Sequence, residues 1–146
     1  LTIHASGGSE MCTFAVKARD ESNPNLKLLA VTVLTSMNQQ QMETLNVHKS
    51  VQDHVLDLAK LSVDANVDGI VSSTHELKLL RDNLGNGPLI VTPGIRPKGA
   101  DLNEQKRVMT PAEAKQLGAD YIVVGRPIYK SEDPLASVKA ILKDIC

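Results

Sequence analysis

Two stretches near the C-terminal end of the chain decide the fold: Pro88-Leu-Ile-Val-Thr-Pro-Gly-Ile-Arg96-Pro97 and Tyr121-Ile-Val-Val-Gly125-Arg126-Pro127. Each is a short apolar, β-branched run typical of a buried parallel strand, and each ends at a glycine and an arginine. A helical segment separates them, so both strands should run in parallel and end at the same edge of one sheet. The loops after the last two strands of a (β/α)8 barrel often hold a phosphate. The pair therefore predicts a phosphate site.

The rest of the chain repeats the alternation of strand and helix. Apolar runs predict five strands, and helical spacing of apolar residues predicts five helices between and after them, which requires a parallel sheet. The expected strands are Leu1–Ala5, Leu28–Leu34, 68–73, Pro88–Thr92 and Asp120–Val124; the expected helices are Met11–Arg19, Ser50–Asn66, Glu76–Leu84, one from Thr110, and Pro134–Asp144, with Asn38–Leu45 a short helix or loop. An internal echo supports repeated units: Asn66-Val-Asp68-Gly-Ile-Val resembles Gly118-Ala-Asp120-Tyr-Ile-Val.

The length sets the expected domain organisation. The chain has 146 residues, whereas a complete (β/α)8 barrel needs roughly 250. It also begins with Leu1-Thr-Ile-His4, which resembles the end of a strand. We therefore expect residues 1–146 to be the last five βα units of a single TIM barrel. A slice alone would leave two open sheet edges, so about three βα units should precede it.

Composition excludes several classes of function. The net charge is −1 and aromatic residues make up 2% of the chain, which argues against nucleic acid as a partner. No apolar stretch reaches the roughly 20 residues of a membrane span, and the start has no signal-peptide pattern. The two cysteines, Cys12 and Cys146, lack metal or redox spacing and fit free thiols in a reducing cytoplasm. The four histidines form no metal set.

The phosphate site has three candidate parts. Gly125 lets the backbone approach an anion, and Arg126 offers a planar fork for two oxygens, although it could also be a surface residue at a turn. Arg96 should lie at the mouth of the neighbouring strand. The long loop from Gly94 to Met109 could close over an anion as a flap. Its Lys98, Lys106 and Arg107 individually fit solvated charges better, and composition alone gives no signal for Gln105.

Two further candidates follow earlier strands. Thr35 and Ser36 come at the end of a buried strand, where their hydroxyls could bind a ligand or simply cap a loop. His4 ends the first strand on the same side, and a structural role for it is favoured over a catalytic one.

Several of these segments together resemble the bacterial-type orotidine 5′-phosphate decarboxylases. They are Thr-Val-Leu-Thr-Ser-Met at 32–37, Val-Thr-Pro-Gly-Ile-Arg-Pro at 91–97, Met-Thr-Pro at 109–111, Val-Gly-Arg-Pro-Ile at 124–128 and the opening His-Ala-Ser-Gly-Gly. The resemblance runs the length of the chain. It implies a cytoplasmic homodimer of TIM barrels that makes UMP and CO2 from orotidine 5′-phosphate in pyrimidine biosynthesis, without cofactor or metal.

The resemblance also implies roles for particular residues. Gly125 and Arg126 correspond to the 5′-phosphate site, Gln105 to the closing flap, and Arg96 and Thr35 to nucleotide contacts. The family's catalytic signature, Asp-x-Lys-x-x-Asp, appears nowhere in this sequence. We therefore expect no catalytic residue in residues 1–146 and no activity from this chain alone.

Two other interpretations stay open. One is a related phosphate-binding barrel enzyme, such as a keto-gulonate-phosphate decarboxylase or an isomerase. The decarboxylase of that pair would need a set of carboxylates for Mg²⁺, and no such set is evident in the sequence. The other is a non-catalytic half-barrel that binds a phosphate ligand or a partner chain.

Overall fold

A computed structural model describes residues 1–97 and 109–145. Five strands form one parallel sheet in the order β1-β2-β3-β4-β5, so each strand pairs with its predecessor in the chain. This order confirms the expected succession of βα units. The strands are β1 (Thr2–His4), β2 (Leu29–Val31), β3 (Gly69–Val71), β4 (Leu89–Thr92) and β5 (Tyr121–Ile122).

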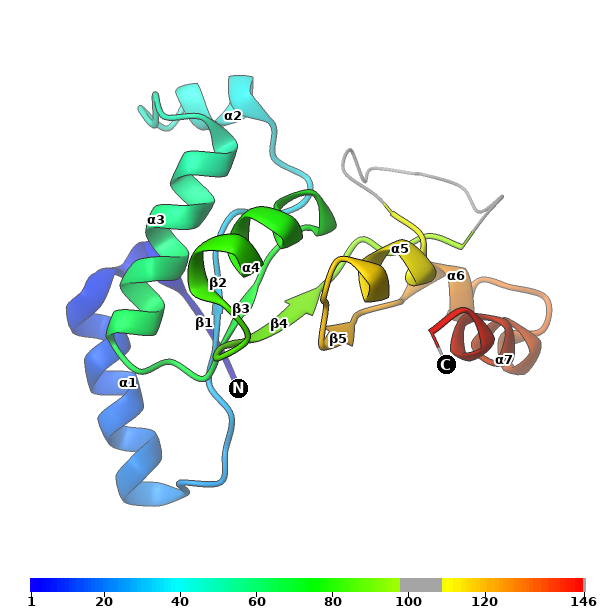
Figure 1. Ribbon diagram of the computed structural model, residues 1–146, viewed down its shortest axis with the longest axis horizontal. Helices are drawn as coiled ribbons and strands as arrows, with labels where there is room; N and C mark the ends of the chain where they lie inside the picture. Colours follow the sequence, from blue (N-terminus) through cyan, green and yellow to red (C-terminus); the bar gives the residue numbers. More distant parts are fainter. Residues whose placement is uncertain (98–108, 146) are drawn as a thin grey trace.

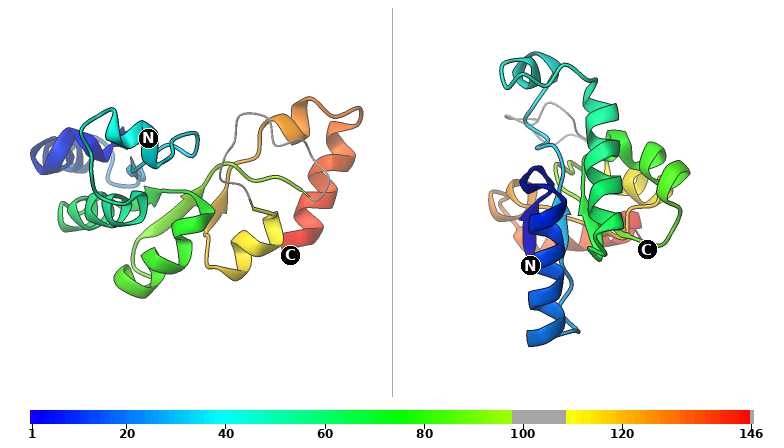
Figure 2. Two further views of the ribbon diagram at one scale, coloured as in Figure 1. Left: turned by 90° about the horizontal axis from the view of Figure 1, so that it is seen from above. Right: turned by 90° about the vertical axis from the view of Figure 1, so that its left-hand side faces the viewer.

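The helices follow one another around one side of the sheet, as the left view in Figure 2 shows. Successive helices α1, α3 and α4 contact each other, and α7 contacts α5 and α6; Figure 1 labels these elements. The helices are η1 (Ala5–Gly7), α1 (Gly8–Ser22), α2 (Gln39–Glu43), α3 (Val51–Asp64), η2 (Thr74–Glu76), α4 (Leu77–Leu84), α5 (Pro111–Gln116), α6 (Arg126–Tyr129) and α7 (Pro134–Ile145).

The two faces of the sheet differ in burial. Ala30, Ile70 and Ile90 point to the helices and are 0% exposed. Tyr121 of β5, in the opposite register, is 60% exposed, and Val123, which directly follows β5, is 51% exposed. In a closed barrel this inner face is filled by side chains from every strand. The sheet therefore has the curvature and covering of part of a barrel, with its interior side uncovered.

Two aspartates lock the start of the sheet in the same way. Asp68, just before β3, accepts hydrogen bonds from the backbone N–H of Leu28 at 2.9 Å and from Arg19 of α1. Asp120, just before β5, accepts from the N–H of Ile90 at 2.6 Å and from Arg81 of α4 at 2.6 Å. Asp68 thus joins the start of β3 to β2 and α1, and Asp120 joins the start of β5 to β4 and α4. The sequence echo at these two positions has this structural basis.

Local sequence explains most helix ends, with one correction. Thr110 and Glu113 form a complete capping box at the start of α5, as their spacing predicts. Gly85 ends α4 as expected. Thr74 is a natural N-cap residue before the expected helix Glu76–Leu84, and its choice as the cap is wrong: the side chain of Ser73 accepts the hydrogen bond from His75 N–H, and Thr74 starts a 3-10 turn.

A candidate phosphate site at the ends of β4 and β5

Arg96 follows β4 and is held in place by its own backbone. Gly94 adopts a φ of 79°, a left-handed conformation that favours glycine, and turns the chain out of β4. Ile95 then pairs with Met109 in an isolated parallel bridge, and Arg96 N–H donates to the Met109 carbonyl at 3.0 Å. The Arg96 side chain is 7% exposed, and its Nη1 donates to the Ile95 carbonyl at 2.8 Å. The guanidinium is therefore buried at a fixed place.

Arg126 reaches the same region from the neighbouring strand. It is the first residue of α6, which begins shortly after β5, and it is half-buried. Gly125 precedes it, and the Gly125 carbonyl accepts hydrogen bonds from Ile128 N–H at 2.8 Å and Tyr129 N–H at 3.2 Å. These bonds fix the turn from which Arg126 projects.

The charges of the two arginines act on each other. Burial lowers the pKa of Arg96, and the positive charge of Arg126 lowers it further, whereas Tyr129 raises it. An arginine remains protonated at neutral pH in any such surroundings. Two neighbouring cations, one of them buried, are an arrangement that a bound anion would stabilise. The structure thus brings together two of the residues that the sequence singled out.

Thr35 lies in a hollow at the same edge of the sheet. The hollow has a volume of about 270 Å³, and the ends of β2, β3 and β4 all contribute to it. Thr35 is buried, at 9% exposed, and Ser36, Ser72 and Pro93 are among the other lining residues. Pro93 connects this hollow to the loop that carries Arg96. Thr35 therefore lies, like the two arginines, at the edge of the sheet where the strands end.

The residues of the expected flap cannot be placed relative to this site. Gln105, Lys98, Lys106 and Arg107 fall in residues 98–108, outside the described residues. One residue that sequence reasoning missed does belong to the region: Tyr129, at the end of α6. Its spacing of three residues from Arg126 on a helix could have indicated it, because residues so spaced share a face.

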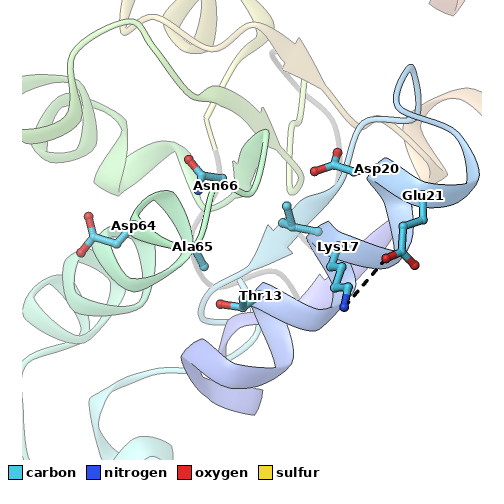
Figure 3. A pocket seen from close by; sticks show the side chains of 8 residues that line it. Thr13, Lys17, Asp20, Glu21, Asp64, Ala65 and Asn66 are labelled. Carbon is cyan, nitrogen blue, oxygen red and sulfur yellow. Dashed lines mark ion pairs between the residues drawn. The ribbon is translucent and has the colours of Figure 1, made fainter.

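A second hollow lies at the other end of the molecule. It has a volume of about 540 Å³ and is formed where α1 and α3 end, with Asp20, Glu21 and Asp64 among its lining residues. Figure 3 shows these side chains around it, with the ion pair of Lys17 and Glu21 at 3.9 Å. Helices that follow parallel strands end near the strand starts, opposite the edge where barrel enzymes bind ligands. This hollow is therefore separate from the candidate site.

Residues 1–97 and 109–145 also bear on metal binding and on membrane insertion. Among them, no group of three or more His, Cys, Asp or Glu side chains could hold a metal ion. No helix in this part of the chain combines the length and apolarity needed to cross a bilayer.

Comparisons with known proteins show the family and the fold of the chain. The family model described as "Orotidine 5'-phosphate decarboxylase / HUMPS family" matches residues 1–141. Orotidine 5′-phosphate decarboxylase from Gluconobacter oxydans is 50% identical over 99% of this chain and 63% of its own length, and that from Staphylococcus saprophyticus is 47% identical over 97% and 62%. The crystal structure of orotidine 5′-phosphate decarboxylase from Lactobacillus acidophilus superposes with a TM-score of 0.84 at 39% identity, covering 99% of this chain and 62% of that one. The chain thus spans about three fifths of the length of these relatives.

Proposed function

The chain belongs to the orotidine 5′-phosphate decarboxylase / HUMPS family, and from this membership we propose that it forms the phosphate- and nucleotide-binding part of an enzyme that converts orotidine 5′-phosphate to UMP and CO2. The names of the relatives support the reaction. On this proposal, residues 1–146 are the C-terminal part of one barrel domain, and the units with the family's Asp-x-Lys-x-x-Asp segment lie outside them.

The pairing of Arg96 with Arg126 is the single observation that carries this proposal. The two guanidinium groups are close enough to influence each other, and Arg96 is 7% exposed. A phosphate dianion between them would be held by charge-assisted hydrogen bonds, which are stronger than those between neutral groups. A planar guanidinium fork also matches the geometry of phosphate oxygens.

The remaining site residues would hold the rest of the nucleotide. Gly125 lets the backbone approach the phosphate closely, since it has no side chain. Thr35 would offer its hydroxyl to the nucleoside from the hollow between β2, β3 and β4. We place Gln105 in the flap that closes on the phosphate, as the family resemblance implies.

Binding at the phosphate would serve the reaction rate as well as affinity. The phosphate is remote from the bond that breaks, and binding energy gained there can be used to organise and desolvate the reacting end. Protonation of the carbon that loses CO2 needs a cationic acid, which the resemblance places on the lysine of the missing signature. The proposal therefore expects residues 1–146 alone to be inactive, and a homodimer in the cytoplasm stays a prediction for the full-length protein.

The test is a decarboxylation assay. The full-length protein should release CO2 from orotidine 5′-phosphate without added metal, and residues 1–146 alone should give no turnover above background. Turnover of a keto-gulonate phosphate instead, dependent on Mg²⁺, would replace the proposal with the related enzyme. Binding of UMP with no turnover of either substrate would support a non-catalytic phosphate-binding protein.

A further inference from the structure

Tyr129 lies against the residues of the proposed phosphate site. It is the last residue of α6, the short helix that begins with Arg126. Its ring lies near Gly125: a Cβ atom built on Gly125 would be 3.6 Å from the Tyr129 Cε1 atom. The backbone N–H of Tyr129 also donates to the Gly125 carbonyl at 3.2 Å. The ring is therefore fixed beside the glycine that opens the turn.

The same side chain acts on the second arginine. Tyr129 is near enough to Arg96 for the negative charge of its ionised form, at high pH, to raise the pKa of Arg96. Arg96 follows β4 and Arg126 follows β5, and Tyr129 ends the one-turn helix α6 that Arg126 begins. It is nonetheless 65% exposed. A large aromatic side chain at this place, open to solvent, has a surface available to a ligand.

We infer that the Tyr129 hydroxyl is a third ligand-binding group of this site, which donates a hydrogen bond to a phosphoryl oxygen held between Arg96 and Arg126. The inference rests on the proposed function and adds to it a residue that sequence reasoning did not single out. A phenol suits the position because it can donate a hydrogen bond without adding charge. A third cation would increase the repulsion between the arginines, and a carboxylate would compete with the phosphate.

The ring contributes a second effect. Its packing against Gly125 covers one side of the turn from which Arg126 projects. Removal of the hydroxyl alone, with the ring retained, separates the hydrogen bond from this packing.

The experiment compares Tyr129→Phe with Tyr121→Phe in the full-length protein. Tyr121 is the control for the loss of a phenol hydroxyl elsewhere, since it is the first residue of β5 and not part of α6. Calorimetry would measure the affinities for UMP and uridine. Loss of one exposed hydrogen bond to a phosphate should weaken UMP binding about threefold to tenfold in Tyr129→Phe. Uridine binding should not change, and Tyr121→Phe should leave both affinities unchanged.

Arg126→Ala in the same assay separates the two claims. If Arg126→Ala weakens the binding of UMP but not of uridine, and Tyr129→Phe weakens neither, the role proposed for Tyr129 is wrong and the phosphate site stands. If neither variant distinguishes UMP from uridine, the proposed function fails first. An equal loss of both ligands in Tyr129→Phe would assign the hydroxyl a structural role and overturn the inference.

A measurement on the unaltered protein guards against a variant that does not fold. With ¹³C-labelled tyrosine, the Tyr129 Cζ resonance should shift when UMP is added and stay in place when uridine is added. A Cζ resonance that responds alike to both ligands, or to neither, would contradict the inference without any substitution.

Discussion

Arg126 lowers the pKa of Arg96, across the ends of two adjacent strands. Burial of Arg96 and the charge of Arg126 both disfavour the charged form of Arg96, and a phosphate bound beside the two side chains would be attracted by both of them. The proximity of these two charged side chains is therefore the physical reason for proposing that a phosphate binds beside them. It also makes the proposal testable by ligands that differ only in the phosphate.

Arg126→Ala should weaken UMP binding about a hundredfold, because it removes charge-assisted hydrogen bonds worth about 1.5–3 kcal/mol each. Uridine, which lacks the phosphate, should bind the variant and the wild-type protein equally well. Isothermal titration of the full-length protein measures both affinities. Lys130→Ala is the control, because it removes an exposed cation next to the same helix; equal losses of UMP and uridine would remove Arg126 from the phosphate site.

Inorganic phosphate should raise the melting temperature of the full-length protein. A ligand that binds only the folded state adds about 2.7 kcal/mol of stability at a hundred times its dissociation constant. Arg96→Gln should abolish most of this increase, because one of the two cations is lost. Sodium chloride at matched ionic strength is the control for screening. An increase that survives in Arg96→Gln would place the anion elsewhere.

Asp68→Asn should destabilise the protein by about 2–3 kcal/mol at pH 7, because Arg19 and the Leu28 N–H would lose a charged partner in a partly buried place. Burial alone would raise the pKa of Asp68, but the hydrogen bonds from Leu28 and Lys27 and the charge of Arg19 together lower it. The contribution is thus present above the unfolded pKa of about 3.9 and is lost as the pH falls through the lower folded value.

Urea unfolding at pH 7 and at pH 3 checks this prediction. The difference between Asp68→Asn and wild type should shrink at the lower pH. Asp57→Asn is the control, since Asp57 pairs with Lys49 on an exposed surface and both side chains are more than half exposed. A constant difference at the two pH values would mean that the ionisation of Asp68 contributes nothing to stability.

Gly69→Ala should destabilise the sheet by about 1–3 kcal/mol through overpacking. An added Cβ at Gly69 would be 2.7 Å from both the Cβ and the carbonyl oxygen of Leu89, and 2.9 Å from Leu29 Cδ2. Gly87→Ala is the matched control, because a Cβ there meets no atom within 4 Å. Thermal unfolding should separate the two substitutions clearly. Equal melting temperatures would show that β3 and β4 can move apart at no cost.

The sequence predicted the alternation of strands and helices because both signals are local. The apolar β-branched runs and the Thr110 capping box depend on neighbours in the chain. Strand ends were less predictable. The run Leu28–Leu34 contributes only Leu29–Val31 to β2, and 120–124 only Tyr121–Ile122 to β5. Within the described residues, β5 lies at the edge of the sheet and pairs only with β4. The residues after Ile122 therefore have no strand on their other side to extend the pairing.

The candidate site was predictable in part for the same reason. Arg96 and Arg126 each follow a strand, so parallel topology alone brings them to one edge. Their mutual effect, the burial of Arg96 and the place of Tyr129 depend on distances between separate βα units, which no local pattern contains. The helix α6 was missed because it is only one turn long.

Asp68 and Asp120 make the same kind of contact at two places in the sheet, and this repetition has a consequence for how the strands are joined. In both places an aspartate just before a strand accepts hydrogen bonds from an arginine on a helix and from a backbone amide at or near the start of the strand that follows that helix. The arginine and the amide are separated by the same number of residues in both places. The stretch of sequence from the arginine to the aspartate therefore contains all the groups that form this set of hydrogen bonds. The same kind of contact therefore joins neighbouring strands and a helix at two separate places in the sheet.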